Sequence, residues 1–375
     1  MNVVPATTRA AVLTEYGANT QVWDLPIPDL DPRGILVTVE AATMCGSDVH
    51  LSQGALSDPK AVFHTELPLV LGHEIVGRVA KLGSDRVVDG LNRPLKEGDL
   101  IAFTYARCRS CFWCSVAHQP TLCENSVNYG YGPVDEFPYL TGGYSEYAYV
   151  MPGCGVVKVP EGLDPALAAS ATCAFRTVVH GFERVGQLKS TDTVVIQGSG
   201  PIGLFAVAYA VQMGVRRTIV IGGPADRLAL AQRWGADAVM DFTEVGIEER
   251  RVRVLEATEG RGADVVLECS GARGAMEEGV GLARRGGKYL LLGVGAPEKA
   301  RIDVTDLVIR EITVLGSAGG DVDHYYQALQ FLADYGDRFP FEAILGNRYG
   351  LEDVGSALAA MKNATEIKPV IIPAK

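Results

Sequence analysis

Residues 193–203 read Thr-Val-Val-Ile-Gln-Gly-Ser-Gly-Pro-Ile-Gly, and this stretch decides the fold. Its first five residues are typical of a fully buried strand, and the apolar stretch at 204–213 predicts a helix. Between them lies a G-x-G-x-x-G turn, with Pro201 at a helix start, where a missing N–H is tolerated. Such glycines let the backbone approach a pyrophosphate, which the amino end of the helix stabilises. The stretch therefore predicts a dinucleotide site rather than a glycine-rich turn without a ligand.

The following region continues to alternate strands with helices. Helices are predicted at 225–234 and 247–258, and further strands at 218–221, 238–240, 265–268, 288–292 and 313–315. Together with residues 193–197 these runs make six strands. An alternation of this kind is typical of a doubly wound parallel sheet, so the fold class is α/β.

The second strand of this region lacks the acidic residue that a dinucleotide fingerprint expects at its end. That carboxylate normally holds the adenosine ribose hydroxyls, and Gly222 stands in its place. Without the carboxylate, the repulsion of a 2′-phosphate is removed. Arg227 could attract such a phosphate, whereas Asp226 beside it would oppose the attraction. The balance favours NAD and leaves NADP open.

A second organising stretch is Leu-Gly-His-Glu-Ile-Val-Gly at 71–77, which predicts His73 and Glu74 side by side in an apolar strand. An imidazole in a dry strand must be hydrogen-bonded or bound to metal, and an isolated one is more often a satisfied core residue. Here Cys45 and Cys173 offer soft ligands. Two thiolates and one imidazole make a catalytic zinc set, because three protein ligands leave a fourth position open.

Four further cysteines form a compact group. Cys108, Cys111, Cys114 and Cys123 have the spacing C-x2-C-x2-C-x8-C, in a loop without hydrophobic periodicity. Such a loop cannot hold itself together by burial, whereas four thiolates around a zinc ion can fix it. The sequence therefore predicts a structural zinc lobe, against the alternative of a coincidental or redox-active group of thiols.

The first third of the chain predicts a compact, barrel-like β domain. Two stretches, 51–68 and 125–141, are long enough to be functional loops, and solvated surface is the alternative for both. Residues 86–95 predict an added hairpin. Leu51, Thr104, Tyr105 and residues near Tyr129 are candidates to line a substrate cavity. The expected strands are 9–13, 35–40, 75–82, 100–103 and 146–150.

Composition excludes some classes of partner. The chain has 375 residues, 47% of them hydrophobic and 21% charged, which is ordinary for a globular protein of about two domains. Its 34 basic against 45 acidic residues give a net charge of −11, which argues against nucleic acid. The amino end has no signal-like core, and the longest apolar run is too short to span a bilayer. We expect a cytoplasmic protein that acts on small neutral molecules.

These motifs occur in one order, and together the chain resembles the zinc-dependent alcohol dehydrogenases of the medium-chain dehydrogenase/reductase superfamily. The motifs are Cys45 with Gly-Ser-Asp-x-x-His behind it, Gly-His-Glu at 72–74, the cysteine lobe, Cys173 followed by Thr177, and the fingerprint at 198–203. The resemblance implies a GroES-like catalytic domain at 1–174, a Rossmann domain at 175–317 and a return segment at 318–375 that completes the catalytic domain.

The resemblance also implies roles for individual residues. Ser47 would take the proton of the substrate alcohol and pass it through the cofactor ribose to His50. Asp48 would orient the zinc-bound histidine, and Glu74 would approach the zinc as a transient ligand or make a structural hydrogen bond. Lys368 would lie near the pyrophosphate, with a solvated lysine as the alternative. The implied cofactor residues are Thr177, Gly198, Gly200, Pro201, Ile202, Gly203, Gly222, Arg227, Leu292, Val294, Ser317 and Lys368.

The expected function is hydride transfer between an alcohol, secondary, cyclic or aromatic, and a nicotinamide cofactor, with two zinc ions per chain. Polyol dehydrogenation is an alternative within the same chemistry. A zinc-free NADPH-dependent quinone or enoyl reductase shares the fold, and metal content would distinguish it. A non-catalytic scaffold stabilised by zinc is a third possibility. The family further implies a homodimer or homotetramer, formed by pairing of edge strands of the cofactor domain.

Overall fold

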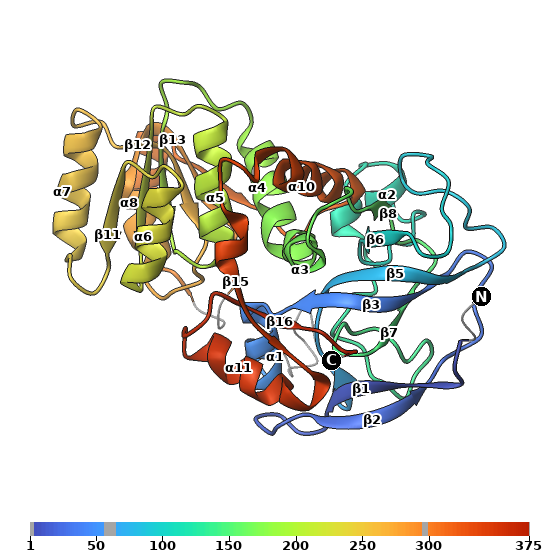
Figure 1. Ribbon diagram of the computed structural model, residues 1–375. Helices are drawn as coiled ribbons and strands as arrows, with labels where there is room; N and C mark the ends of the chain where they lie inside the picture. Colours follow the sequence, from blue (N-terminus) through green and yellow to red (C-terminus); the bar gives the residue numbers. More distant parts are fainter. Residues whose placement is uncertain (1–3, 56–64, 295–298, 375) are drawn as a thin grey trace. The chain divides into compact units, whose positions relative to one another are not determined.

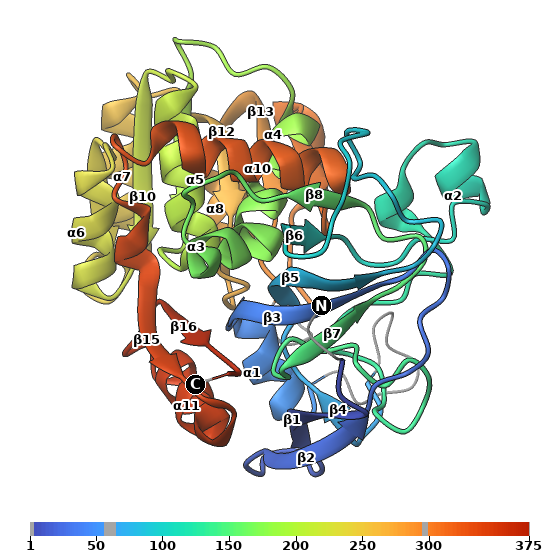
Figure 2. The same cartoon turned by 45° about the vertical axis from the view of Figure 1, so that its right-hand side comes forward.

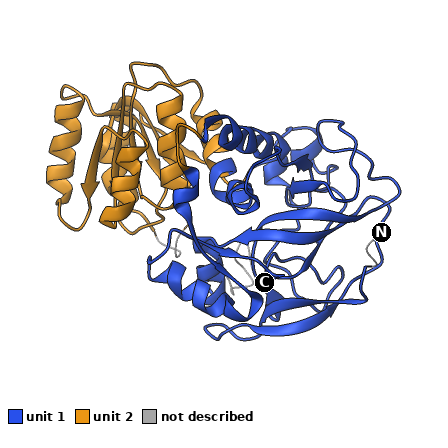
Figure 3. Cartoon of the chain, viewed as in Figure 1, with its two compact units in different colours: residues 1–176, 320–336, 341–375 blue, residues 177–319, 337–340 orange. Residues whose placement is uncertain are grey.

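In the computed structural model, which describes residues 4–55, 65–294 and 299–374, the chain divides into two units (Figure 1). Unit 1 comprises residues 1–176, 320–336 and 341–375, and unit 2 comprises residues 177–319 and 337–340 (Figure 3). No helix among the described residues is both long enough and apolar enough to cross a bilayer. Residues 56–64 of the expected loop at 51–68 lie outside the described residues.

Unit 2 is built on a six-stranded parallel sheet with the strand order β11-β10-β9-β12-β13-β14. This order, in which β9, the first strand of the unit, lies third in the sheet, confirms the predicted doubly wound topology. α5 and α6 pack against strands β9 to β11, while α8 and α9 pack against β12 and β13. The strands are β9 (Thr193–Gln197), β10 (Arg217–Gly222), β11 (Ala238–Asp241), β12 (Ala263–Glu268), β13 (Ala283–Leu291) and β14 (Thr313–Gly316).

The helices of unit 2 include three that the sequence pattern did not predict, α4, α8 and α9. α8 contains two glycines, and α9 is only one to two turns long, so neither shows a clear helical period. All five residues of β9 are buried, as expected for a strand in the centre of the sheet. The helices are α4 (Arg176–Val185), α5 (Pro201–Gln212), α6 (Ala225–Arg233), α7 (Ile247–Ala257), α8 (Ala275–Leu282) and α9 (Val304–Arg310).

Unit 1 holds a seven-stranded sheet and a three-stranded sheet of order β2-β1-β4 (Figure 2). In the larger sheet β16, from the end of the chain, pairs antiparallel with β3, so the return segment completes the sheet. The predicted strands are present, and β2, β4, β8 and β15 were not predicted. The strands are β1 (Thr7–Leu13), β2 (Gln21–Pro26), β3 (Ile35–Thr43), β4 (Leu69–Val70), β5 (Glu74–Leu82), β6 (Leu100–Phe103), β7 (Tyr147–Val150), β8 (Val156–Lys158), β15 (Leu345–Tyr349) and β16 (Lys368–Ile371).

Helices of unit 1 flank these sheets, and one of them corrects the sequence interpretation. α1 extends to Ser52, so the first residues of the expected loop at 51–68 are helical. The predicted hairpin at 86–95 is present, closed by a bridge between Val88 and Pro94. The helical segments are α1 (Gly46–Ser52), α2 (Phe112–Ser115), η1 (Pro120–Leu122), α3 (Pro165–Ser170), η2 (Ala171–Phe175), α10 (Val322–Tyr335), η3 (Phe341–Ile344), η4 (Leu351–Asp353) and α11 (Val354–Lys362).

Candidate metal and cofactor sites

Three separate elements of unit 1 bring the predicted catalytic ligands together. Cys45 lies between β3 and α1, as the residue that caps the helix. His73 directly precedes β5, so the prediction that it lies within a strand is wrong by one residue, while Glu74 is the first residue of β5. Cys173 lies in η2, a π-helical turn. Such widened turns are often found at functional sites, and nothing in the local sequence signals this one.

The ligand atoms of Cys45, His73, Glu74 and Cys173 all lie within 4.8 Å of one another. Ligands at about 2.0–2.3 Å from a zinc ion are separated by no more than about 4.6 Å, so the cluster has the size of a zinc site. A hydrogen bond with Cys173, followed by burial, raises the pKa of Cys45 to about 12, while the bond with Cys45 lowers the pKa of Cys173. One thiolate therefore forms readily, and a bound cation would release the second proton.

Asp48 connects the cluster to the backbone around it. Its side chain is fully buried and accepts hydrogen bonds from the N–H groups of Cys45, at 2.8 Å, and Gly72, at 3.2 Å. Its Oδ1 lies 3.3 Å from Nδ1 of His73, which leaves Nε2 as the ring nitrogen available to a metal. Burial acts to raise the pKa of Asp48, but the nearby His73 and the two N–H donors lower it. Asp48 is therefore ionised and can orient the imidazole.

Glu74 and Lys368 form a fully buried ion pair. The Lys368 ammonium donates to Oε1 of Glu74 at 2.8 Å and lies 2.6 Å from Oε2, and Thr43 Oγ1 also donates to this carboxylate. Burial raises the pKa of Glu74 to about 7 against the opposing charge of Lys368. The alternative of a solvated lysine is therefore wrong. The Lys368 ammonium pairs, within unit 1, with the carboxylate of Glu74, the residue after His73.

Ser47 and His50 lie on α1, beside the cluster. The Cys45 thiol donates to Ser47 Oγ at 3.8 Å, which places this hydroxyl at the metal site. His50 is three positions further on and half-buried, on the same face of the helix as Ser47. The ring of Tyr131 is 6.2 Å from that of His73, and the Tyr105 hydroxyl interacts electrostatically with His73. In contrast, Leu51, Thr104 and Tyr129 are buried in the core.

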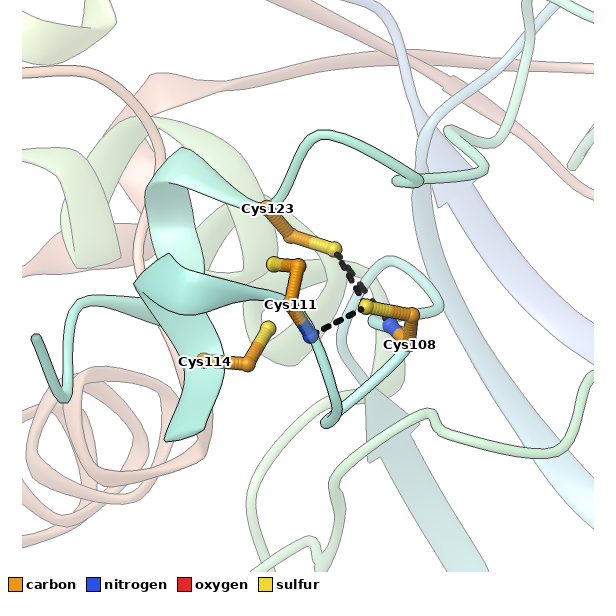
Figure 4. Close-up of side chains that lie close together, drawn as sticks. All are labelled: Cys108, Cys111, Cys114 and Cys123. Carbon is orange, nitrogen blue, oxygen red and sulfur yellow. Dashed lines mark hydrogen bonds between the residues drawn. The ribbon is translucent and has the colours of Figure 1, made fainter. Parts of the chain in front are cut away.

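The four-cysteine lobe brings its sulfur atoms together (Figure 4). The backbone N–H of Cys108 donates to the sulfur of Cys123, and that of Cys111 to the sulfur of Cys108, each at 3.3 Å. The backbone N–H groups of Ser110 and Cys111 lower the pKa of Cys108 to about 5. Amides that donate to a thiolate stabilise the form that binds metal, so this donor set fits zinc.

The lobe is attached to the amino end of α10 by a two-pronged ion pair. The two terminal nitrogens of Arg109 lie 2.9 and 3.1 Å from the two carboxylate oxygens of Asp321. Arg109 follows the first cysteine of the lobe and has a φ of 56°. A bidentate pair fixes orientation as well as distance, so the lobe is held by this contact in addition to its own cysteines.

The predicted pyrophosphate turn has the geometry that the fingerprint requires. Gly198 has a φ of 109°, and a Cβ at Gly203 would lie 1.9 Å from the carbonyl oxygen of Gly198, so both positions need glycine. A Cβ at Gly200 would meet nothing within 4 Å, which leaves the backbone there open to a ligand. Pro201 is the first residue of α5, as expected. The amino end of this helix is therefore ready for a phosphate group.

The place of the missing carboxylate is taken by a serine. A Cβ at Gly222 would lie 2.5 Å from Ser199 Oγ, which bonds to both the N–H and the carbonyl of Gly223 at 2.9 Å. In register with Gly222 on the neighbouring strand stands Asp241, which sequence reasoning missed. Its carboxylate accepts from the N–H and the hydroxyl of Thr243, and these bonds lower its pKa. The signal was available, because Asp241 directly follows the predicted strand at 238–240.

The other predicted cofactor residues of unit 2 differ in exposure. Thr177, Arg227 and Leu292 are buried, whereas Val294 is 72% exposed. The Ser317 hydroxyl lies 3.1 Å from Nδ1 of His180. His180 therefore helps to position Ser317. All the predicted cofactor residues lie in unit 2 except Lys368.

Two family models match the chain. The model described as the alcohol dehydrogenase GroES-like domain matches residues 31–161, and the model described as zinc-binding dehydrogenase matches residues 201–334. The first match contains three residues of the candidate metal cluster and all four of the cysteine lobe. The second begins at Pro201 and contains the last three residues of the pyrophosphate turn.

Similar proteins align over nearly the whole chain. The 5-exo-hydroxycamphor dehydrogenase of Pseudomonas putida is 34% identical over 365 residues, 97% of this chain and 98% of that protein. An alcohol dehydrogenase structure from Thermotoga maritima aligns with a TM-score of 0.90 and 34% identity, covering 98% of this chain and 99% of that one. A zinc-binding dehydrogenase structure from Sinorhizobium meliloti, bound to NADP, aligns with a TM-score of 0.83 and 29% identity, covering 98% and 100%.

Proposed function

Because the chain belongs to the zinc-dependent alcohol dehydrogenase family of oxidoreductases, we propose that it transfers a hydride from a secondary, cyclic or aromatic alcohol to NAD. The observation that carries this proposal is the buried cluster of Cys45, His73 and Cys173, with a serine hydroxyl beside it. Three such ligands leave one coordination position for a substrate oxygen. A quinone reductase that works without zinc has no use for this arrangement.

These three residues would hold one zinc ion, with Glu74 as a transient ligand or a structural partner. A zinc ion held there supplies a Lewis acid that lowers the pKa of an alcohol hydroxyl toward neutrality. Ser47 takes the proton that the hydroxyl loses, because its Oγ is the hydroxyl nearest Cys45 on α1. His50, on the same face of the helix and half-buried, passes the proton toward solvent.

We assign a second, structural zinc ion to the cysteine lobe, so that the chain carries two. The lobe contributes no hydroxyl or carboxylate ligand and has no open position, which is the mark of a structural site. We propose that the catalytic domain consists of residues 1–174 and 318–375, with the cofactor domain at 175–317. The eight cysteines are all free thiols, which supports a cytoplasmic location, where thiols stay reduced.

NAD is proposed as the preferred cofactor, on electrostatic grounds. Arg227, the cation that could attract a 2′-phosphate, is 8% exposed, and burial lowers its pKa. Asp241 instead places a negative charge at the carboxyl end of β11, in register with Gly222. A carboxylate there repels a phosphate on the adenosine ribose, as the usual residue at the end of the second strand would.

The walls near His73 support an apolar or aromatic substrate. Tyr131 lies against the His73 ring, and Tyr105 lies close enough to interact with it. The similar protein from Pseudomonas putida is named for hydroxycamphor, which makes a cyclic secondary alcohol the first substrate to test here. Polyols are the second, because they present the same carbinol group with more polar neighbours.

A homodimer or homotetramer is proposed from the edge of the unit 2 sheet. β14 is an edge strand and pairs only with β13 within that sheet. Three apolar side chains of α9, just before it, are 63–70% exposed: Val304, Val308 and Ile309. An edge strand with exposed apolar neighbours is suited to pair with a second copy.

The proposal is tested by initial rates of reduced-nicotinamide formation over primary, secondary, cyclic, aromatic and polyol alcohols, with NAD and with NADP. We expect the cyclic and aromatic secondary alcohols to give the highest kcat/KM, with NAD preferred by at least tenfold. Protein shown to contain two zinc ions that oxidises none of these alcohols would contradict the proposal. Full activity in zinc-free protein would favour the quinone or enoyl reductase instead.

A further inference from the structure

Four side chains of unit 1 alternate as a stack of guanidinium groups and tyrosine rings. The guanidinium carbon of Arg107 lies 5.5 Å from the ring centre of Tyr105. That of Arg176 lies 5.7 Å from the ring centre of Tyr105 and 5.7 Å from that of Tyr325. We call these four residues the tyrosine–arginine stack. Arg176 is its central member, because it contacts both rings.

The stack is buried, and its contacts are of the cation–π kind. Arg176, Arg107 and Tyr325 are all at most 6% exposed. Nη1 of Arg176 and Nε of Arg107 are buried without a hydrogen-bond partner among the described residues. A guanidinium over a ring face interacts favourably with the π electrons there, more strongly when it is removed from water. The ring faces therefore contribute to stabilising the two buried charges, together with a hydrogen bond between Arg176 and the Tyr325 side chain and one from Arg107 to Ser126.

The backbone is arranged to hold Arg176 in place. Its Nε donates to the carbonyl of Thr172 at 3.0 Å, across the π-helical turn that carries Cys173. Gly320 leaves room for the side chain, since a Cβ there would lie 2.9 Å from Arg176 Cδ. The helical backbone at 171–185 would form without either of these two contacts. Both fix the guanidinium three residues after a proposed metal ligand.

The stack meets the candidate site at Tyr105. The backbone of the preceding residue is fixed, because Thr104 Oγ1 donates to the Tyr105 carbonyl and accepts from the N–H of Gly155, each at 2.9 Å. Tyr105 lies beside the turn that carries Cys173, because Arg176, whose guanidinium carbon is 5.7 Å from its ring centre, is bonded to the Thr172 carbonyl of that turn. The orientation of the Tyr105 ring therefore depends on the two guanidinium groups over it.

We propose that Arg176 is a positioning residue that determines substrate specificity by holding Tyr105 as a rigid wall of the alcohol pocket. This inference rests on the proposed function. A rigid wall favours a bulky cyclic alcohol that fills the space against it, because less side-chain motion is lost on binding. A small alcohol such as 2-propanol does not reach the Tyr105 ring, so its binding does not depend on how that ring is held.

The test compares three variants: Arg176→Met, Arg176→Lys and Tyr325→Leu. Arg176→Met keeps most of the side-chain length but removes the planar, charged guanidinium group. We expect Arg176→Met and Tyr325→Leu each to raise KM for cyclohexanol about tenfold, with kcat and the KM for 2-propanol within twofold of wild type. The KM of Arg176→Lys for cyclohexanol should lie between those of wild type and Arg176→Met, because an ammonium retains the charge but not the flat contact. The double variant, Arg176→Met with Tyr325→Leu, should have a KM for cyclohexanol no higher than that of either single variant, because both substitutions act through one stack.

A matched control is Arg338→Met, which removes a guanidinium 5.1 Å from the ring of Phe339 in unit 2. It should leave both KM values unchanged. Equal effects of Arg176→Met on both alcohols, loss of zinc in that variant, or additive effects in the double variant would overturn the proposal. If the wild type oxidises no alcohol, the proposed function fails by itself. The stack is then judged by coupling between Arg176→Met and Tyr325→Leu in urea unfolding, where additive effects would reject it.

Discussion

Asp48 shows how a single buried carboxylate organises the candidate metal cluster. It accepts from the backbone of Cys45 and of Gly72, and it faces the ring nitrogen of His73. These contacts join the segments that carry two of the three proposed ligands. Its charge favours the imidazole tautomer in which Nε2 is free to bind metal.

Replacing Asp48 by asparagine should therefore weaken the site while preserving its shape. We expect Asp48→Asn to lower zinc affinity or kcat/KM by about 10- to 100-fold, the range found for partners of metal-bound histidines. Chelator competition and initial rates measure the two effects. Unchanged zinc affinity and unchanged rates would contradict the claim that Asp48 orients His73 for metal binding. The buried carboxylate of Asp89, replaced in the same way, is the control and should leave both unaltered.

At the same scale, we propose that Asp241 determines the cofactor preference, because it lies in register with Gly222. Its asparagine variant keeps the acceptor for Thr243 but removes the charge, so the turn is preserved. We expect Asp241→Asn to raise the ratio of kcat/KM for NADP over that for NAD about tenfold, because a repulsion is lost. Glu244→Gln, which neutralises an exposed acid nearby, should not change the ratio. A ratio unaffected by Asp241→Asn would place the discrimination elsewhere.

Among the elements, the hairpin at residues 86–95 depends on one carboxylate. Asp89 accepts from the N–H groups of Leu91 and Arg93, each at 2.9 Å, and from Arg93 Nε at 2.7 Å. Burial acts to raise the pKa of Asp89, but these donors lower it below its usual value. Its stabilisation is therefore complete above the unfolded pKa of about 3.9 and is lost as pH falls through the lower folded pKa.

This linkage predicts the behaviour of Asp89→Asn. At pH 7 the variant should lose about 1–3 kcal/mol of unfolding free energy, with the lower end favoured because Arg93 is partly exposed. The difference from wild type should shrink as pH falls below about 4, because the wild-type carboxylate becomes protonated as well. Urea unfolding at pH 7 and at pH 3.5 measures it. A difference that grows on acidification would contradict the sign of the shift.

The elements also show which parts of the fold the sequence could predict. The six strands of unit 2 were predictable because buried parallel strands are continuous apolar runs between glycines, as at 193–203. The strands β2, β4, β8 and β15 were not, because β2 and β15 bury few of their residues and β4 and β8 have only two and three residues. The π-helical turn at Cys173 has no local signal at all, since its residues would also suit an ordinary helix.

The candidate site divides in a similar way. Cysteines and histidines at characteristic spacings predict ligands, because few other residues bind zinc. Lys368 shows that spacing along the sequence does not predict contacts between distant segments. Its partner Glu74 is 294 positions away in the sequence, so only the fold shows that the ammonium is buried on a carboxylate. Arg176 and Tyr325 are likewise separated by most of unit 2 along the chain.

For the whole molecule, association should depend on α9 and β14 of unit 2. Val308 is 70% exposed, and a charge at this position would meet a partner subunit rather than water if the proposed interface forms. We expect Val308→Asp to shift the protein toward the monomer in analytical ultracentrifugation. Lys299→Asp, which places the same charge on a polar position before α9, should keep the assembly. A wild-type protein that is monomeric at all concentrations would contradict the interface.

The central claim is that a metal held by Cys45, His73 and Cys173 makes this chain an alcohol dehydrogenase. The most direct test is the initial rate of NADH formation from cyclohexanol by Cys45→Ala, beside wild type with the same cysteine-lobe zinc content. The account predicts a loss of at least 100-fold, because two ligands no longer hold the ion that acidifies the alcohol. A rate within a few-fold of wild type would contradict the account.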